Sequence, residues 1–110
     1  MNQDLDLKAQ IKQILKLVKE IAPGRSVELR IPPYAAVQCV GGRTHRRGTP
    51  INVVEMKAET LIRLLESPDL WDQFCDLGAF SASGTNSNLI NLFVQVSKLM
   101  ISEVRSENGK

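Results

Sequence analysis

The sequence contains few of the residues that build metal centres and disulfide frameworks. It has one histidine and two cysteines among 110 residues. Cys39 and Cys75 are far apart in the sequence, lie among apolar neighbours, and have neither C-x-x-C spacing nor a nearby histidine to complete a metal site. The sequence therefore predicts no metal and no cofactor. We expect two buried, reduced thiols; a disulfide is the alternative, but a permanent bridge is uncommon in a cytoplasmic chain.

Long apolar runs and an excess of one charge are also missing. No segment has the length of a membrane span, and the start of the chain lacks the basic residues and unbroken apolar stretch of a secretory signal. The 14 basic and 12 acidic residues leave a net charge of +2, which is too balanced to indicate nucleic-acid binding. We therefore expect a cytoplasmic protein without a nucleic-acid partner.

What is present is the composition of an ordinary globular domain. Hydrophobic residues make up 43% of the chain and charged residues 24%. A chain of 110 residues lies within the usual range for one domain, and no internal repeat or interdomain linker interrupts it. We predict a single domain over residues 1–105 and a frayed tail over residues 106–110.

The first half of the chain passes from a helical to an alternating pattern. Apolar residues at three- and four-residue steps predict an amphipathic helix from Leu7 to Ile21, which Pro23-Gly24 ends. Alternation of apolar and polar residues then predicts strands, and Pro32-Pro33 separates the first from the second. The predicted strands cover residues 26–31, 34–40 and 51–56.

The second half is predicted to be mainly helical. A short helix carries Ala58, Leu61, Ile62 and Leu65 on one face. A second short helix, with Ser67 as its N-cap, ends at Gly78 and precedes a brief strand over residues 79–83. The last helix, over residues 88–104, is apolar around most of its circumference.

This order of elements predicts an α+β domain. We expect a largely antiparallel sheet of about four to five strands, with the helices packed mainly on one face. The expected fold therefore has one hydrophobic core between its helical layer and its sheet.

A basic loop between the second and third strands is a candidate anion site. Its cationic residues could contact a phosphate, a lipid head group or an acidic partner. They are Arg43, His45, Arg46 and Arg47. Solvated surface charge is the alternative, with Glu55 pairing with one of the arginines. The chain has no second histidine to partner His45, so the sequence does not predict catalysis.

Two segments carry a family resemblance. VELRIPPYAAVQCV, residues 27–40, resembles the opening hairpin of the short bacterial branch of the sterol carrier protein type 2 superfamily, and HRRGTPINVVE, residues 45–55, resembles its loop and third strand. The segment from Ala58 through Trp71 and Gly78 is similar to the helix pair and glycine of that superfamily. Ile51 departs from the pattern, because the branch commonly has a second proline there.

The resemblance implies an α+β fold in which a curved sheet and overlying helices enclose an apolar lipid-binding tunnel. It implies no catalysis, and relatives also occur as accessory domains of enzymes. Because a 110-residue domain has few spare apolar residues, we expect a reduced cavity here, between the sheet and the helices.

The last helix is the main candidate for ligand contact. Its wide apolar surface is typical of core packing, of a cavity wall or of a subunit interface, and in the last case an outward-facing residue such as Ile101 would contact the partner. If it lines a cavity, Phe93 and Met100 are the residues expected beside a ligand, since large or flexible apolar groups can shape a pocket. The predicted apolar ligand-binding residues are Ile62, Leu65, Trp71, Phe74, Phe93 and Met100.

The leading functional hypothesis is a non-catalytic domain that binds a small lipid or another small apolar molecule. One alternative is an interaction or homodimerisation module without a ligand, and another is an accessory domain for a thiol-dependent enzyme. The sequence leaves monomer and homodimer open.

Overall fold

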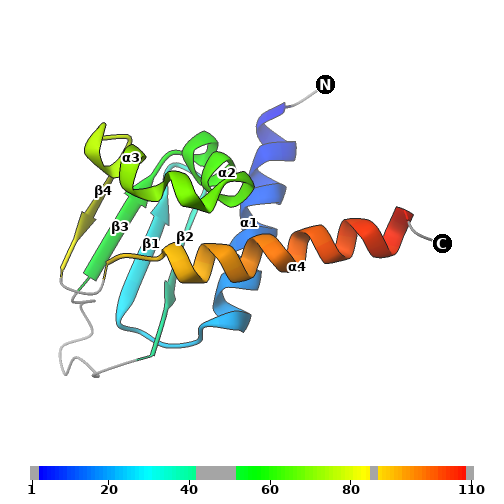
Figure 1. Cartoon of the computed structure of the whole chain (residues 1–110), viewed down its shortest axis with the longest axis horizontal. Coiled ribbons are helices and arrows are strands. Elements are labelled where there is room, and N and C mark those ends of the chain that lie inside the picture. The colour runs from blue at the N-terminus through cyan, green and yellow to red at the C-terminus, as the bar shows by residue number, and fades with distance from the viewer. Residues whose placement is uncertain (1–2, 42–51, 85–86, 109–110) are drawn as a thin grey trace.

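The computed structural model describes the backbone of residues 3–41, 52–84 and 87–108, and the side chains of residues 5–41, 52–84 and 87–101 (Figure 1). The helices are α1 (Gln3–Ile21), α2 (Ala58–Glu66), the 3-10 helix η1 (Pro68–Leu70), α3 (Trp71–Asp76) and α4 (Ile90–Asn108). The strands are β1 (Val27–Ile31), β2 (Ala35–Cys39), β3 (Asn52–Met56) and β4 (Phe80–Ser83). The fold is α+β, as predicted.

The four strands form one mixed sheet in the order β2-β1-β3-β4. β1 and β2 pair as an antiparallel hairpin, in which Tyr34 N–H donates to the Ile31 carbonyl across the turn at 2.8 Å. β3 lies parallel to β1, and β4 returns antiparallel to β3. Two of the three strand pairs are therefore antiparallel, and the parallel pair places β3 in the middle of the sheet beside β1.

The helices cover one face of this sheet (Figure 1). In β1 the residues Val27, Leu29 and Ile31 are fully buried, whereas Arg30 between them is exposed. In β3 Val54 is fully buried beside the exposed Glu55. Because successive side chains of a strand point to opposite faces, this alternation identifies a helix-covered face and an open polar face.

A tight joint connects the end of α1 to the sheet. Val40 N–H donates to the Ala22 carbonyl at 2.7 Å, and the Val40 carbonyl accepts from Ser26 N–H at 3.1 Å and from Ser26 Oγ at 2.9 Å. Val40 adopts φ 65°, which is strained for a β-branched residue. Gly24 passes so close to the Val40 carbonyl that the joint has no room for a side chain at that position.

Helix α4 runs along the longest axis of the molecule (Figure 1). Its 19 residues span about 28 Å at 1.5 Å per residue. The first half packs against α2, η1 and α1, and the second half extends past the body. This extension makes the molecule 47 Å long but only 28 and 27 Å across.

Several local predictions differ from the structure. Ser67 is the N-cap of the helical segment that begins with η1, as predicted, but its side chain makes no capping hydrogen bond. Its N–H donates to the Arg63 carbonyl, so the same residue also ends α2. Cys75 is exposed rather than buried, since α3 is short and only its first turn, at Trp71, is buried in the body. The last helix continues to Asn108, beyond the predicted end near residue 104 and into the predicted tail.

Replacing Gly24 by alanine is expected to destabilise the fold. An alanine Cβ would lie 2.2 Å from the Val40 carbonyl oxygen, and the φ of +150° at Gly24 is one that L-residues rarely adopt. We expect a loss of at least about 2 kcal/mol in the free energy of unfolding, measured by urea denaturation.

Gly78→Ala is the matched control. Gly78 also has a positive φ, of +72°, but a Cβ there would meet nothing within 4 Å. Its cost should therefore be limited to about 1 kcal/mol from the left-handed backbone conformation. Equal losses of unfolding free energy in the two variants would contradict this prediction, because they would show that the backbone at Val40 moves away from the added Cβ without an energetic cost.

The two cysteines should react at very different rates with a thiol reagent. Cys39 is fully buried, and its burial raises the pKa of the thiol to about 11 from an ordinary value of 9.0, which reduces the reactive thiolate at neutral pH about a hundredfold. Cys75 is exposed and should be labelled first by 5,5′-dithiobis(2-nitrobenzoic acid). Cys75→Ser should remove the fast phase, and Cys39 should react only as the protein unfolds. A single shared rate would contradict the placement of Cys39 in the core.

Candidate functional site

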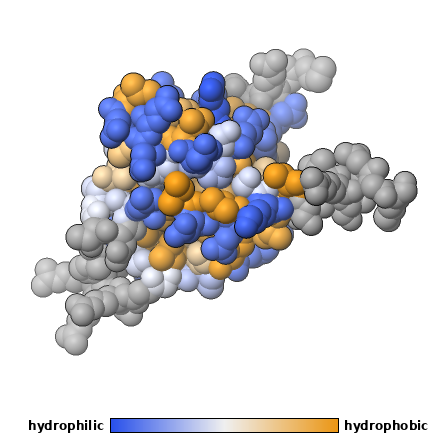
Figure 2. Space-filling model, viewed as in Figure 1, coloured by the Kyte–Doolittle hydropathy of each residue, from blue (hydrophilic) through white to orange (hydrophobic). Residues whose placement is uncertain are grey.

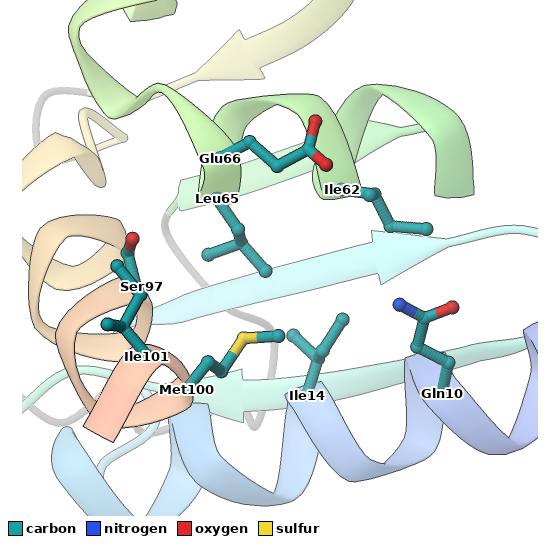
Figure 3. A pocket seen from close by; sticks show the side chains of 8 residues that line it. All are labelled: Gln10, Ile14, Ile62, Leu65, Glu66, Ser97, Met100 and Ile101. Atoms are coloured by element: carbon teal, nitrogen blue, oxygen red, sulfur yellow. The ribbon is translucent and has the colours of Figure 1, made fainter. Parts of the chain in front are cut away.

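An apolar cleft of about 530 Å³ lies between α1, α2 and α4 (Figure 3). The residues that line it are Gln10, Ile14, Ile62, Leu65, Glu66, Ser97, Met100 and Ile101. Its volume is within the range of about 300 to 1,000 Å³ that is typical of small-molecule sites. Five of the eight lining residues are apolar, so the cleft offers mainly hydrophobic contact.

Helical periodicity explains how α4 contributes to the cleft. Phe93 and Val96 lie on the face of α4 that is fully buried in the core. Ser97 lies four residues after Phe93, and Met100 lies seven residues after it. Both residues therefore remain close to that face of the helix. Where α4 leaves the core, its core-facing stripe therefore becomes one wall of the cleft.

The other two walls come from α1 and α2. Ile14, on the buried face of α1, is only 1% exposed to solvent, and Leu65 of α2 is 4% exposed. Figure 3 shows the flexible Met100 side chain reaching from α4 toward Ile14, with Leu65 on the opposite side. These three residues form an apolar floor that connects the cleft to the hydrophobic core.

Polar groups stand at the rim of the cleft. Gln10 on α1 and Glu66 on α2 are exposed, and Ser97 on α4 is half-buried. Glu66 is the one ionisable residue among the described residues that line the cleft. The site can therefore surround an apolar body and offer hydrogen-bonding groups at its edge.

Three of the predicted ligand-binding residues line the cleft, namely Ile62, Leu65 and Met100. The other three, Trp71, Phe74 and Phe93, do not. Phe93 is fully buried and packs edge-on against Trp71 with the ring centroids 5.4 Å apart. Trp71 in turn packs on Phe80 of β4 at 4.5 Å.

These ring separations are those of close aromatic packing in a protein interior. Phe74 is half-buried, and the guanidinium of Arg63 lies 5.9 Å from its ring centroid. Trp71, Phe80 and Phe93 therefore pack on one another where α3 and α4 meet the sheet, whereas the cleft lies between α1, α2 and α4.

Sequence reasoning missed five of the lining residues: Gln10, Ile14, Glu66, Ser97 and Ile101. Ile14 has the same spacing as the core residues of α1, and only the packing of α1 beside α4 places it at the edge of the cleft. Gln10 lies one helical turn before Ile14, and Glu66 lies one turn after Ile62. Their place in the cleft can be predicted only when it is known which helices pack together.

The predicted anion site lies outside the described residues, since Arg43, His45, Arg46 and Arg47 fall within residues 42–51. The alternative pairing of Glu55 with one of these arginines lies outside the described residues as well. Among the described residues, Glu55 Oε1 lies 4.0 Å from Arg30 Nη1 on the open face of the sheet. Arg30 Nε also donates to Glu28 Oε2 at 2.6 Å, which raises the pKa of Arg30. Arg30 therefore lies between two carboxylates on this face, those of Glu28 and Glu55.

Within the described ranges, no group of three or more His, Cys, Asp or Glu side chains is arranged to hold a metal ion. None of the helices in those ranges has the length and apolar character needed to cross a membrane.

Comparisons with known proteins agree with this architecture. Among solved structures, a protein titled UbiJ-SCP2 ubiquinone synthesis protein matches with a TM-score of 0.50 and 12% sequence identity, covering 90% of this chain and 94% of that one. At this identity the likeness concerns the fold alone. No curated protein matches the chain. A family model described as bacterial SCP ortholog matches residues 4–94. The chain therefore belongs to the bacterial SCP ortholog family, which confirms its resemblance to the sterol carrier protein type 2 superfamily.

Proposed function

We propose that this protein binds a small apolar molecule in the cleft between α1, α2 and α4. The observation that carries the proposal is the continuity of the cleft with the core: its floor, Ile14 and Leu65, is apolar and almost fully buried. The sterol-carrier-like fold supports an apolar ligand, although here the space is bounded by three helices.

Burial of apolar surface would supply most of the binding free energy. Ile101 lines the cleft and is 52% exposed, so a ligand can cover much of its side chain. Met100 has a flexible thioether side chain that can adjust to ligands of different shape. Both features favour a ligand recognised by its hydrophobic body more than by a set of directed hydrogen bonds.

The proposed binding is non-catalytic. General acid-base catalysis needs a titratable group positioned by a partner and aimed at a reacting atom. Glu66 is exposed at the rim, and among the described residues no second titratable side chain lines the cleft. We therefore expect a ligand to leave the protein chemically unchanged.

Ile101→Ser should weaken ligand binding, and Leu99→Ser should not. Both residues are exposed apolar side chains on α4, but only Ile101 lines the cleft. Losing its apolar contact should cost about 1 kcal/mol, which corresponds to about a fivefold increase in Kd. The neutral fluorescent probe N-phenyl-1-naphthylamine measures this affinity, with native mass spectrometry of protein from its source testing for a bound molecule. The absence of saturable probe binding, or equal losses in the two variants, would contradict the proposed site.

A second candidate function is self-association through α4. Leu99 is 43% exposed and Ile101 52% exposed, and both lie on α4. Figure 2 shows apolar surface on the face that α4 crosses, interspersed with hydrophilic side chains. An apolar side chain exposed on a projecting helix is a typical contact in a symmetric dimer.

Light scattering distinguishes this candidate from ligand binding. If α4 forms a dimer, Leu99→Glu and Ile101→Glu should both give folded monomers, because each places a charge in the apolar contact. Circular dichroism checks that the variants remain folded. A wild-type protein that remains monomeric at high concentration would exclude self-association. Ligand binding would then be the remaining candidate function of this helix.

A further inference from the structure

We infer that Glu66 selects the head group of the ligand, favouring cationic and neutral hydrogen-bond donors over anions such as carboxylates. This inference rests on the proposed binding of an apolar molecule in the cleft. It concerns the chemistry at one end of that site, where the lining changes from apolar to polar.

The first argument is the charge at the rim. Glu66 lines the cleft together with uncharged residues only, and among the described residues it makes no ion pair or hydrogen bond. No described residue occupies its carboxylate oxygens, which act as hydrogen-bond acceptors. A ligand head that donates hydrogen bonds, such as a hydroxyl or an ammonium group, could bind to them.

The second argument is the direction of α2. Glu66 is the last residue of this nine-residue helix, whose carboxyl end carries a partial negative charge from its terminal carbonyl groups. The helix dipole and the Glu66 carboxylate therefore act with the same sign at this end of the cleft. An anionic head group placed there meets repulsion from both.

The third argument is the position of the nearby cations. Arg63, on the same helix, lies over the ring of Phe74 and is not part of the cleft lining. Lys98 lies beside Ser97 in sequence but is exposed and also absent from the lining. No described lining residue can therefore neutralise Glu66 or offer a carboxylate ligand a counterion.

Gln10 complements this arrangement from the facing helix. Figure 3 places Gln10 on α1 and Glu66 on α2, on opposite sides of the apolar lining. The amide of Gln10 can both donate and accept a hydrogen bond, so it accommodates a hydroxyl group. The discrimination between head groups therefore depends on Glu66, whose carboxylate can only accept.

Three ligands with the same decyl chain test the inference: decylamine, 1-decanol and decanoate. Their affinities are measured at pH 7.5 and low ionic strength by displacement of N-phenyl-1-naphthylamine. We expect decylamine to bind more tightly than decanol, and decanol more tightly than decanoate. Because Glu66 is exposed and partly screened by solvent, each step should be only about threefold.

Substitutions at position 66 assign the preference to this residue. Glu66→Gln keeps the shape of the side chain and should reduce the differences among the three ligands to the small part that the carboxyl end of α2 contributes, whereas Glu66→Lys should reverse their order. Glu59→Gln is the matched control, since Glu59 is an exposed glutamate at the other end of α2 and does not line the cleft. It should leave the wild-type order unchanged.

The outcomes separate this inference from the proposed function. Displacement of the probe by all three ligands with equal affinity, or affinity differences in Glu66→Gln as large as in the wild type, would overturn the role of Glu66 while the cleft remains a binding site. Failure of the probe and of every ligand to bind would overturn the proposed function and the inference with it.

Discussion

The packing of Phe93 against Trp71 is the contact on which the arrangement of the cleft depends. Phe93 is fully buried, and Trp71 links it to Phe80 on the edge strand β4. One aromatic group from α4, one from α3 and one from the sheet are thereby held together in a chain with few aromatic residues. This contact directs the Phe93 face of α4 into the core, and helical periodicity then decides which of its later residues face α1 and α2.

The cleft follows from how far this anchored helix extends. Once Phe93 and Val96 fill the core, the next residues on nearly the same face, Ser97 and Met100, have no sheet beneath them to cover. A small domain cannot supply side chains to close every such gap. The apolar stripe of α4 therefore continues into an open site, and the boundary between core and site falls within a single turn of the helix.

The elements could be predicted from the sequence because each depends on a local pattern. The spacing of Ile11, Ile14, Leu15 and Val18 is sufficient for α1, and the resemblance at residues 27–40 anticipated the opening hairpin. The cleft depends instead on which helices meet. Phe93 and Met100 were both expected beside a ligand from their chemistry. Met100 lines the cleft, whereas Phe93 lies about two turns earlier and is fully buried in the core. Periodicity assigns both residues to one face and does not reveal where the core ends.

An open apolar site has a thermodynamic consequence for the whole domain. Ile101 and Met100 are held partly in water because no side chain of the described fold covers them, so the hydrophobic free energy of that surface is not gained on folding. A bound apolar molecule would recover part of it. Since Ile14 and Leu65 belong to both the core and the cleft floor, such a molecule would bind the folded state alone and increase the free energy of unfolding. The proposed binding would therefore be coupled to stability through the same residues.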